Sequence, residues 1–102
     1  MKRRYILAPQ TARDLVQIWR YIRKESSEET ADRVESVIRS KFVYLADFPQ
    51  AGHWRSDLTA AEVRFLAVYS YLIVYRPETK PLQIVAILHA HRDVAKILPK
   101  RV

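Results

Sequence analysis

The side chains that could carry acid–base or phosphate chemistry are few. His53, His89 and His91 are the only histidines, and the absence of cysteine excludes a thiolate nucleophile and a disulfide framework. His89 and His91 point the same way if a strand continues through them, and Arg92 follows directly. With Arg64, which alternates with apolar neighbours, they could combine proton transfer with stabilisation of a phosphate. One candidate chemistry is therefore RNA cleavage by Arg64 with His89 or His91.

These residues also have structural interpretations. Arg64 could equally be an arginine at a sheet edge, with its stem packed and its head in water. Two histidines this close also occur as half-exposed residues at strand ends. No third ligand follows at a recognisable spacing, so the sequence predicts no metal site. Trp54 and Arg55 form an aromatic–basic pair that we interpret as a cap over the end of the core.

The most apolar and aromatic run, residues 62–76 (EVRFLAVYSYLIVYR), is the element that must position Arg64. Its β-branched and aromatic residues predict a hairpin with strands over 62–68 and 71–76 and a loop at Tyr69-Ser70. A two-residue loop would pair Val68 with Tyr71, Leu66 with Ile73 and Arg64 with Tyr75. Both faces of this hairpin are apolar, so both need cover.

Around the hairpin, the spacing of apolar residues predicts the remaining elements. A short strand over residues 3–8 precedes a first helix from Pro9 and Ala12 to about Lys24, and Pro9 suits the first helical turn. Ser26 and Glu29 have the spacing of a capping box for a second helix, which Phe48-Pro49 ends. A loop over 50–61, a strand over 82–89 and a short helix opened by residues 91–93 complete the chain. We expect the stripe formed by Leu15, Ile18, Ile22, Val34 and Ile38 to be buried.

This order predicts one α+β domain over residues 1–102, β-α-α-β-β-β, with a helix hairpin on one face of a mostly antiparallel sheet and a short C-terminal helix. The second face would then be covered by the C-terminal segment, a second copy or a partner chain. The net charge of +7 favours a polyanionic partner, either nucleic acid or an acidic protein surface. No apolar run is long enough for a membrane span or a signal peptide, so we expect a cytoplasmic protein.

The ordered motifs carry a resemblance that spans nearly the whole chain. They are residues 5–8 before a helix with Ala12, Asp14-Leu15 and Ile18; Tyr21-Ile22; Ala31 and Ile38; Leu45 with Phe48-Pro49 and Gly52; Asp57-Leu58; Val63-Arg64; residues 71–76; and residues 87–89 with Arg92-Asp93. In this order and spacing the sequence resembles toxins of the RelE/ParE superfamily of type II toxin–antitoxin systems. It is most similar to the ParE-like branch, the plasmid stabilisation proteins.

The resemblance implies a toxin that a cognate, acidic ParD-like antitoxin neutralises by wrapping its C-terminal segment around the toxin. Such an antitoxin would cover the second face of the sheet and could link the complex to operator DNA. ParE-like members typically poison DNA gyrase by binding, whereas RelE-like members are ribosome-dependent mRNA endonucleases. No tyrosine follows His89 or His91 here, unlike in the nuclease branch, and Tyr69-Ser70 replaces the glycine-containing turn common in the family.

We therefore predict a gyrase-binding toxin with no catalytic residue and no cofactor. The alternatives are an mRNA endonuclease that uses Arg64, His89 and His91, and a non-toxic antitoxin partner or transcriptional co-repressor. The residues expected to bind the target are Arg92, Lys96, Lys100 and Arg101. Those expected to bind the antitoxin are Arg64, Leu66, Tyr71, Ile73 and Tyr75.

Overall fold

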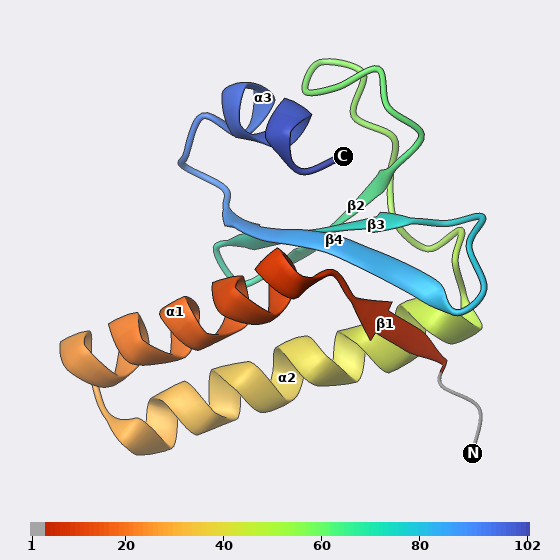
Figure 1. Ribbon diagram of the computed structural model, residues 1–102. Coiled ribbons are helices and arrows are strands. Elements are labelled where there is room, and N and C mark those ends of the chain that lie inside the picture. Colours follow the sequence, from red (N-terminus) through yellow and green to blue (C-terminus); the bar gives the residue numbers. More distant parts are fainter. Residues whose placement is uncertain (1–3) are drawn as a thin grey trace.

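The computed structural model describes residues 4–102 and shows a sheet with helices on both of its sides (Figure 1). In chain order the elements are β1 (Tyr5–Leu7), α1 (Pro9–Glu25), α2 (Glu28–Asp47), β2 (Arg64–Val68), β3 (Tyr71–Arg76), β4 (Leu82–His89), α3 (Val94–Ile97) and the 3₁₀ turn η1 (Leu98–Lys100). The predicted α+β class and element order are confirmed. The observed strand β1 is shorter than the strand predicted over residues 3–8, of which residue 3 lies outside the described part of the chain.

The four strands lie in the order β1-β4-β3-β2, with β1 parallel to β4 and the other neighbours antiparallel. The predicted hairpin register is confirmed, since Val68 lies opposite Tyr71 and Arg64 opposite Tyr75. The first strand of the hairpin begins two residues later than predicted, at Arg64. Tyr69 in the loop has a φ of 54°, the left-handed conformation that glycine would adopt at lower cost.

The two long helices begin and end where local chemistry dictates. Pro9 occupies the first turn of α1, and Arg23 and Lys24 lie in its last turn against the negative end of the helix dipole. The capping box predicted for Ser26 and Glu29 is wrong, because Ser27 is the N-cap of α2. Its hydroxyl accepts the Thr30 N–H at 3.0 Å. Phe48 caps the other end of α2, as Phe48-Pro49 predicted.

One face of the sheet is buried beneath α1 and α2. Leu15, Ile18, Ile38, Phe42 and Leu45 from the helices form a single cluster with sheet residues that include Tyr71, Ile73, Tyr75, Ile84 and Ile87. Ile22 and Val34, expected in the same stripe, are only partly buried at its margin. Thr11 is fully buried, and its hydroxyl donates to the Ile84 carbonyl at 3.0 Å. The helix pair is thereby fixed to the central strand β4.

The chain itself covers the second face. Val94 and Leu98 from the C-terminal segment pack on Phe65, Val74 and other residues of that face, and the segment after α2 adds Leu58 and Val63. Figure 1 shows α3 on the side of the sheet opposite to α1 and α2. Of the three covers expected from the sequence, the C-terminal segment is therefore the one observed. The C-terminal segment thus occupies area on this face that the resemblance assigned to an antitoxin. Among the helices of residues 4–102, none has the length and apolarity needed to cross a bilayer.

Candidate functional site

Arg64 and the two histidines of the nuclease hypothesis lie at opposite ends of the sheet. Arg64 is opposite Tyr75 and His89 is opposite Tyr71, which puts four residue steps of β3 between them. At the rise of a strand this is about 13 Å along the sheet, and two strand spacings add about 10 Å across it. Arg64 and His89 therefore do not lie beside one another in this structure.

Arg64 is occupied by the segment that follows α2. Its Nη1 donates to the Gly52 carbonyl at 2.8 Å and its guanidinium lies 4.3 Å from the centre of the Trp54 ring. Its Nε is buried without a hydrogen-bond partner. Tyr75 supports the same segment, because its hydroxyl donates to the Pro49 carbonyl at 2.7 Å and accepts the Gly52 N–H at 2.8 Å. These contacts indicate that Arg64 holds the loop in place.

The histidines meet at the far end of β4. The His89 and His91 rings are 5.1 Å apart, and the Tyr71 ring meets the His89 ring edge-on at 5.3 Å. The His91 N–H donates to Nδ1 of His89 at 3.2 Å. Burial raises the pKa of the Tyr71 hydroxyl above its ordinary value, and Tyr21 adds to the effect, so this phenol stays protonated at neutral pH. The cluster offers polar groups but no carboxylate in contact with either imidazole among residues 4–102.

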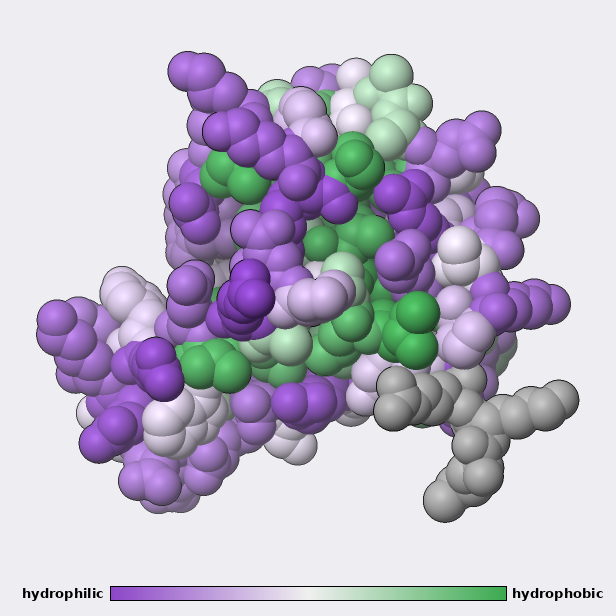
Figure 2. Space-filling model, viewed as in Figure 1, coloured by the Kyte–Doolittle hydropathy of each residue, from purple (hydrophilic) through white to green (hydrophobic). Residues whose placement is uncertain are grey.

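A groove runs from this cluster along α1 to the C-terminal segment. A cavity of about 300 Å³ is lined by Tyr21, Tyr71 and His89 among others, and a second of about 440 Å³ continues past Arg92 to Lys96 and Lys100. The two cavities share Asp14, Gln17 and Arg92. Figure 2 shows a patch of hydrophobic residues between α1 and the C-terminal segment, surrounded by hydrophilic side chains.

Four residues were expected to bind a target, and three of them are exposed cations that line this groove. Arg92, Lys96 and Lys100 are exposed, and none forms an ion pair with an acidic side chain of residues 4–102. Their positions follow from Asp93, whose side chain caps α3 by accepting the Lys96 N–H at 3.3 Å. They form a positive rim around a cavity whose lining is mixed, with Leu88 and Ile97 beside Asp14 and Gln17.

Arg101, the fourth, has a different place. Its guanidinium forms a two-pronged ion pair with Asp14 of α1, at 2.5 and 3.3 Å, and its side chain is 5% exposed. Arg101 also donates to the Val85 carbonyl at 3.3 Å, and Asp14 accepts the Ile87 N–H at 3.1 Å. A partner could reach this guanidinium only by displacing Asp14. Arg101 is therefore a structural residue in this conformation.

The Asp14–Arg101 pair closes an open edge of the sheet. β1 pairs with β4 only as far as Ile84, so beyond that residue β4 has a strand beside it only on the β3 side. A register shift between β3 and β4, where Tyr75 pairs with Ile84 and Val74 with Ala86, leaves Val85 as an extra residue at the same place. Asp14 and Arg101 bind the backbone groups exposed there, which protects the edge from pairing with another strand.

The residues expected to bind an antitoxin are mostly in the core. Ile73 and Tyr75 are completely buried beneath the helices and Tyr71 is nearly so, which leaves Arg64 and Leu66 partly exposed. Burial raises the pKa of Tyr75, while the N–H of Gly52 and the charge of Arg64 oppose this. Direct contact with a partner on this face is therefore limited to Arg64, Leu66 and the margin of Tyr71.

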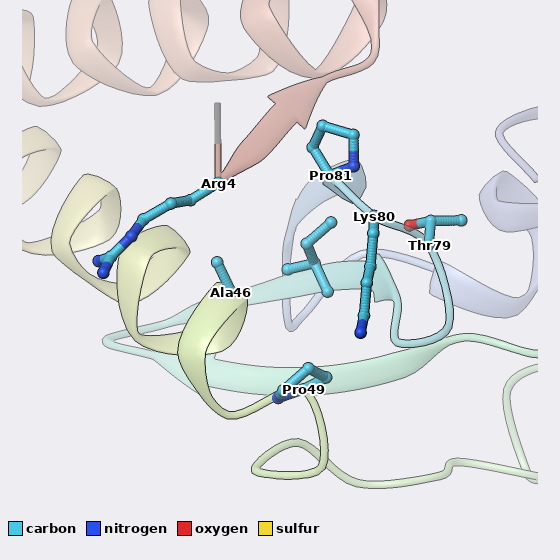
Figure 3. Close-up of a pocket in the computed structure, with 7 residues that line it drawn as sticks. Arg4, Ala46, Pro49, Thr79, Lys80 and Pro81 are labelled. Atoms are coloured by element: carbon cyan, nitrogen blue, oxygen red, sulfur yellow. The ribbon is translucent and has the colours of Figure 1, made fainter. Parts of the chain in front are cut away.

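The opposite end of the sheet has a cavity of its own. It measures about 540 Å³ and lies between the end of α2 and the turn before β4, as Figure 3 shows. Ala46, Pro49, Pro81 and Leu82 give it apolar walls. Lys80 and Arg4 add positive charge, although Arg4 is paired with Asp47 at 3.3 Å. Sequence reasoning missed this cavity because its walls come from segments far apart in the chain.

The architecture defines a class of protein. A helix hairpin on one face of a four-stranded, mostly antiparallel sheet, in the element order β-α-α-β-β-β, is the arrangement implied by the resemblance to RelE/ParE toxins.

Comparisons with known proteins specify the family. The model of a family described as the ParE toxin of type II toxin–antitoxin system, parDE, matches residues 5–94. The chain therefore belongs to the ParE toxin family. A search of curated proteins finds no match.

A solved structure supports the fold. A chain of the chromosomal ParDE TA system from P. aeruginosa superposes with a TM-score of 0.72 at 21% sequence identity, covering 83% of this chain and 92% of that chain. At this level of identity the similarity establishes the shared fold.

Proposed function

We propose that this ParE-family toxin acts in the cytoplasm by binding DNA gyrase, and that an acidic antitoxin neutralises it. The observation that carries the proposal is the cationic groove formed by Arg92, Lys96 and Lys100. Three exposed cations that form no ion pair within residues 4–102 suit an acidic protein surface or a DNA-bound target. Arg101 is left out of the binding set, because its charge is already neutralised by Asp14.

The nuclease hypothesis has less support. Proton transfer and phosphate stabilisation must act on one reacting group within hydrogen-bond reach. Arg64 instead holds the Gly52 carbonyl and stacks on Trp54, while His89 and His91 lie at the other end of the sheet. Without Arg64, the only candidate near the two histidines for binding a phosphate is Arg92. We therefore keep ribosome-dependent mRNA cleavage as an outcome of the test and not as a second proposal.

The test compares growth arrest, plasmid supercoiling and cleavage of ribosome-bound mRNA in cells that express the toxin. We expect altered supercoiling and intact mRNA. A toxin that moves no proton should remain toxic when His89→Gln and His91→Gln are combined. It should lose toxicity when Arg92, Lys96 and Lys100 are changed to Gln together, since its electrostatic anchor is removed.

A matched control carries three changes to Gln on exposed basic residues of the helices: Arg13, Arg20 and Arg33. It loses the same net charge, and we expect its toxicity to be unchanged. Cleaved mRNA that disappears in the double histidine variant would overturn the proposal. Equal loss of toxicity in the control would attribute the effect to overall charge and not to the groove.

A further inference from the structure

Two exposed aromatic side chains are in contact at the C-terminal end of α2, and a third lies on the segment that follows. Tyr44 and Phe48 are one helical turn apart, 44% and 60% exposed, and their rings are 5.4 Å apart. Trp54, 52% exposed, follows on the segment that Tyr75 and Arg64 hold in place. We call Tyr44, Phe48 and Trp54, with the cations Lys41 and Arg64, the aromatic surface.

The two cations of the aromatic surface are in contact with its rings. The Lys41 ammonium lies 5.7 Å from the centre of the Tyr44 ring and the Arg64 guanidinium 4.3 Å from that of Trp54. Neither cation has an acidic side chain within ion-pair distance in the part of the chain that the structure describes. The surface therefore combines exposed aromatic area with two cations that form no ion pair within residues 4–102; Asp47, the acid next to Phe48, is paired with Arg4.

We propose that the aromatic surface binds an acidic segment of the antitoxin, one that presents apolar side chains between its carboxylates. This inference rests on the proposed function, which supplies an acidic antitoxin. Tyrosine, tryptophan and arginine are the residue types that dominate binding energy at protein interfaces. Carboxylates of the partner would pair with Lys41 and Arg64, while its apolar side chains would cover Phe48 and Tyr44.

Charge and geometry favour this occupant over two others. A second copy of this chain would bring two sets of Lys41 and Arg64 together, and each copy carries a net charge of +7. Single-stranded nucleic acid needs open ring faces for its bases. Here Arg64 covers one face of Trp54 and Lys41 lies over Tyr44, while the tilted contact between Tyr44 and Phe48 limits access further.

The proposed surface differs from the antitoxin-binding location expected from the sequence. Arg64 belongs to both sets of residues, but Ile73 and Tyr75 lie buried beneath the helices. Tyr75 also supports the segment that carries Trp54. The sequence signal for the new location is the pair Tyr44 and Phe48, four residues apart and beside the buried stripe that contains Phe42 and Leu45. An aromatic pair on the exposed side of an amphipathic helix is a pattern that folding alone does not require.

The test measures the dissociation constant of the purified cognate antitoxin for toxin variants by calorimetry. We expect Phe48→Ser or Tyr44→Ser to weaken binding about 30-fold, the loss typical of an interface anchor. Lys41→Glu should weaken antitoxin binding about tenfold or more. Raised salt should reduce the difference in dissociation constant between this variant and the wild type. Because Tyr44 and Phe48 are exposed and Lys41 is only partly buried, thermal unfolding of the free variants should stay close to that of the wild type.

The controls are Val16→Ser and Arg20→Glu, which make the same kinds of change on the exposed face of α1. We expect both to bind the antitoxin as the wild type does. If the antitoxin binds the wild type and all variants equally, the inference fails and the proposed function stands. If it does not bind the wild type, both fail.

Two further outcomes would also refute the inference. The free toxin could be a dimer that Phe48→Ser converts to a monomer in sedimentation, with antitoxin affinity unchanged. The variant could instead lose affinity for a single-stranded oligonucleotide while it keeps its affinity for the antitoxin. Either result would assign the aromatic surface to a second copy or to nucleic acid.

Discussion

Arg101→Ala should destabilise the fold far more than the same change at its neighbour Lys100. The Arg101 and Asp14 side chains are 5% and 13% exposed, and the change would leave the Asp14 carboxylate without its counter-ion. Removing one member of a buried pair costs about 3–5 kcal/mol. Asp14 would keep the Ile87 N–H and some contact with water, so we expect the lower end of that range, about 3 kcal/mol.

Equilibrium unfolding in urea measures this cost. For a slope of about 1.5 kcal/mol per molar, a loss of about 3 kcal/mol moves the midpoint down by about 2 M. Lys100→Ala is the matched control, because Lys100 is exposed and forms no ion pair within residues 4–102. Its effect should stay within about 0.5 kcal/mol. The double variant Asp14→Asn with Arg101→Gln removes both charges, so it should lose less stability than the two single changes added together.

The reasoning is refuted if Arg101→Ala costs no more than Lys100→Ala. It is also refuted if the Asp14 and Arg101 changes are additive, because independent effects would mean that the two side chains do not interact in solution. A fall in the urea slope without a change in the midpoint would indicate altered compactness and not a lost ion pair.

Three other predictions follow from the core and the segment after α2. Ile38→Ala should lower the free energy of unfolding by about 2–5 kcal/mol in urea, because Ile38 is fully buried; a loss below about 0.5 kcal/mol would contradict the observed packing. Gly52→Ala should cost about 1–3 kcal/mol in the same assay, since the new Cβ would meet the Tyr75 hydroxyl and lie 2.9 Å from the Phe65 carbonyl; unchanged stability would mean that this segment adjusts freely. Burial raises the pKa of Tyr75, so its contribution to stability is complete below about pH 10 and is lost as the pH rises through the folded-state value. Unfolding at pH 8 and pH 11 should show this loss, and Tyr75→Phe should reduce it; an equal loss in the variant would assign the effect to other groups.

The sequence predicted the strands and helices because their signals are local. The register of β2 with β3 follows from the alternation of apolar residues and the two-residue loop between the strands. The bounds of β4 follow from the same alternation and from the two prolines around the turn after Arg76. The error at the start of α2 is equally local. Ser26 and Ser27 are both good N-caps, and the choice between them depends on where α1 ends.

The functional surfaces were harder to predict because they depend on contacts between distant segments. Arg101 looked like one more terminal cation, and only the fold shows that Asp14, 87 residues away, neutralises it. The extra residue Val85 leaves no mark in an apolar strand, yet it creates the backbone site that Arg101 binds. Arg64 and His89 seemed compatible with one site because the sequence does not show which ends of the strands they occupy. Val94 and Leu98, four residues apart, were the available signal that the C-terminal segment covers the second face.

The same ion pair links stability to the proposed binding surface. Arg92, Lys96 and Lys100 lie on the segment that begins after β4 and ends at Arg101, and the apolar contacts of Val94 and Leu98 hold only its middle. Loss of the Asp14–Arg101 contact would free the end of this segment, so the cations would lose their fixed spacing even in molecules that remain folded. Arg101→Ala should therefore weaken target binding together with stability, whereas Lys100→Gln should weaken binding alone. This difference separates a residue that positions the groove from one that contacts the target, although both carry the same charge.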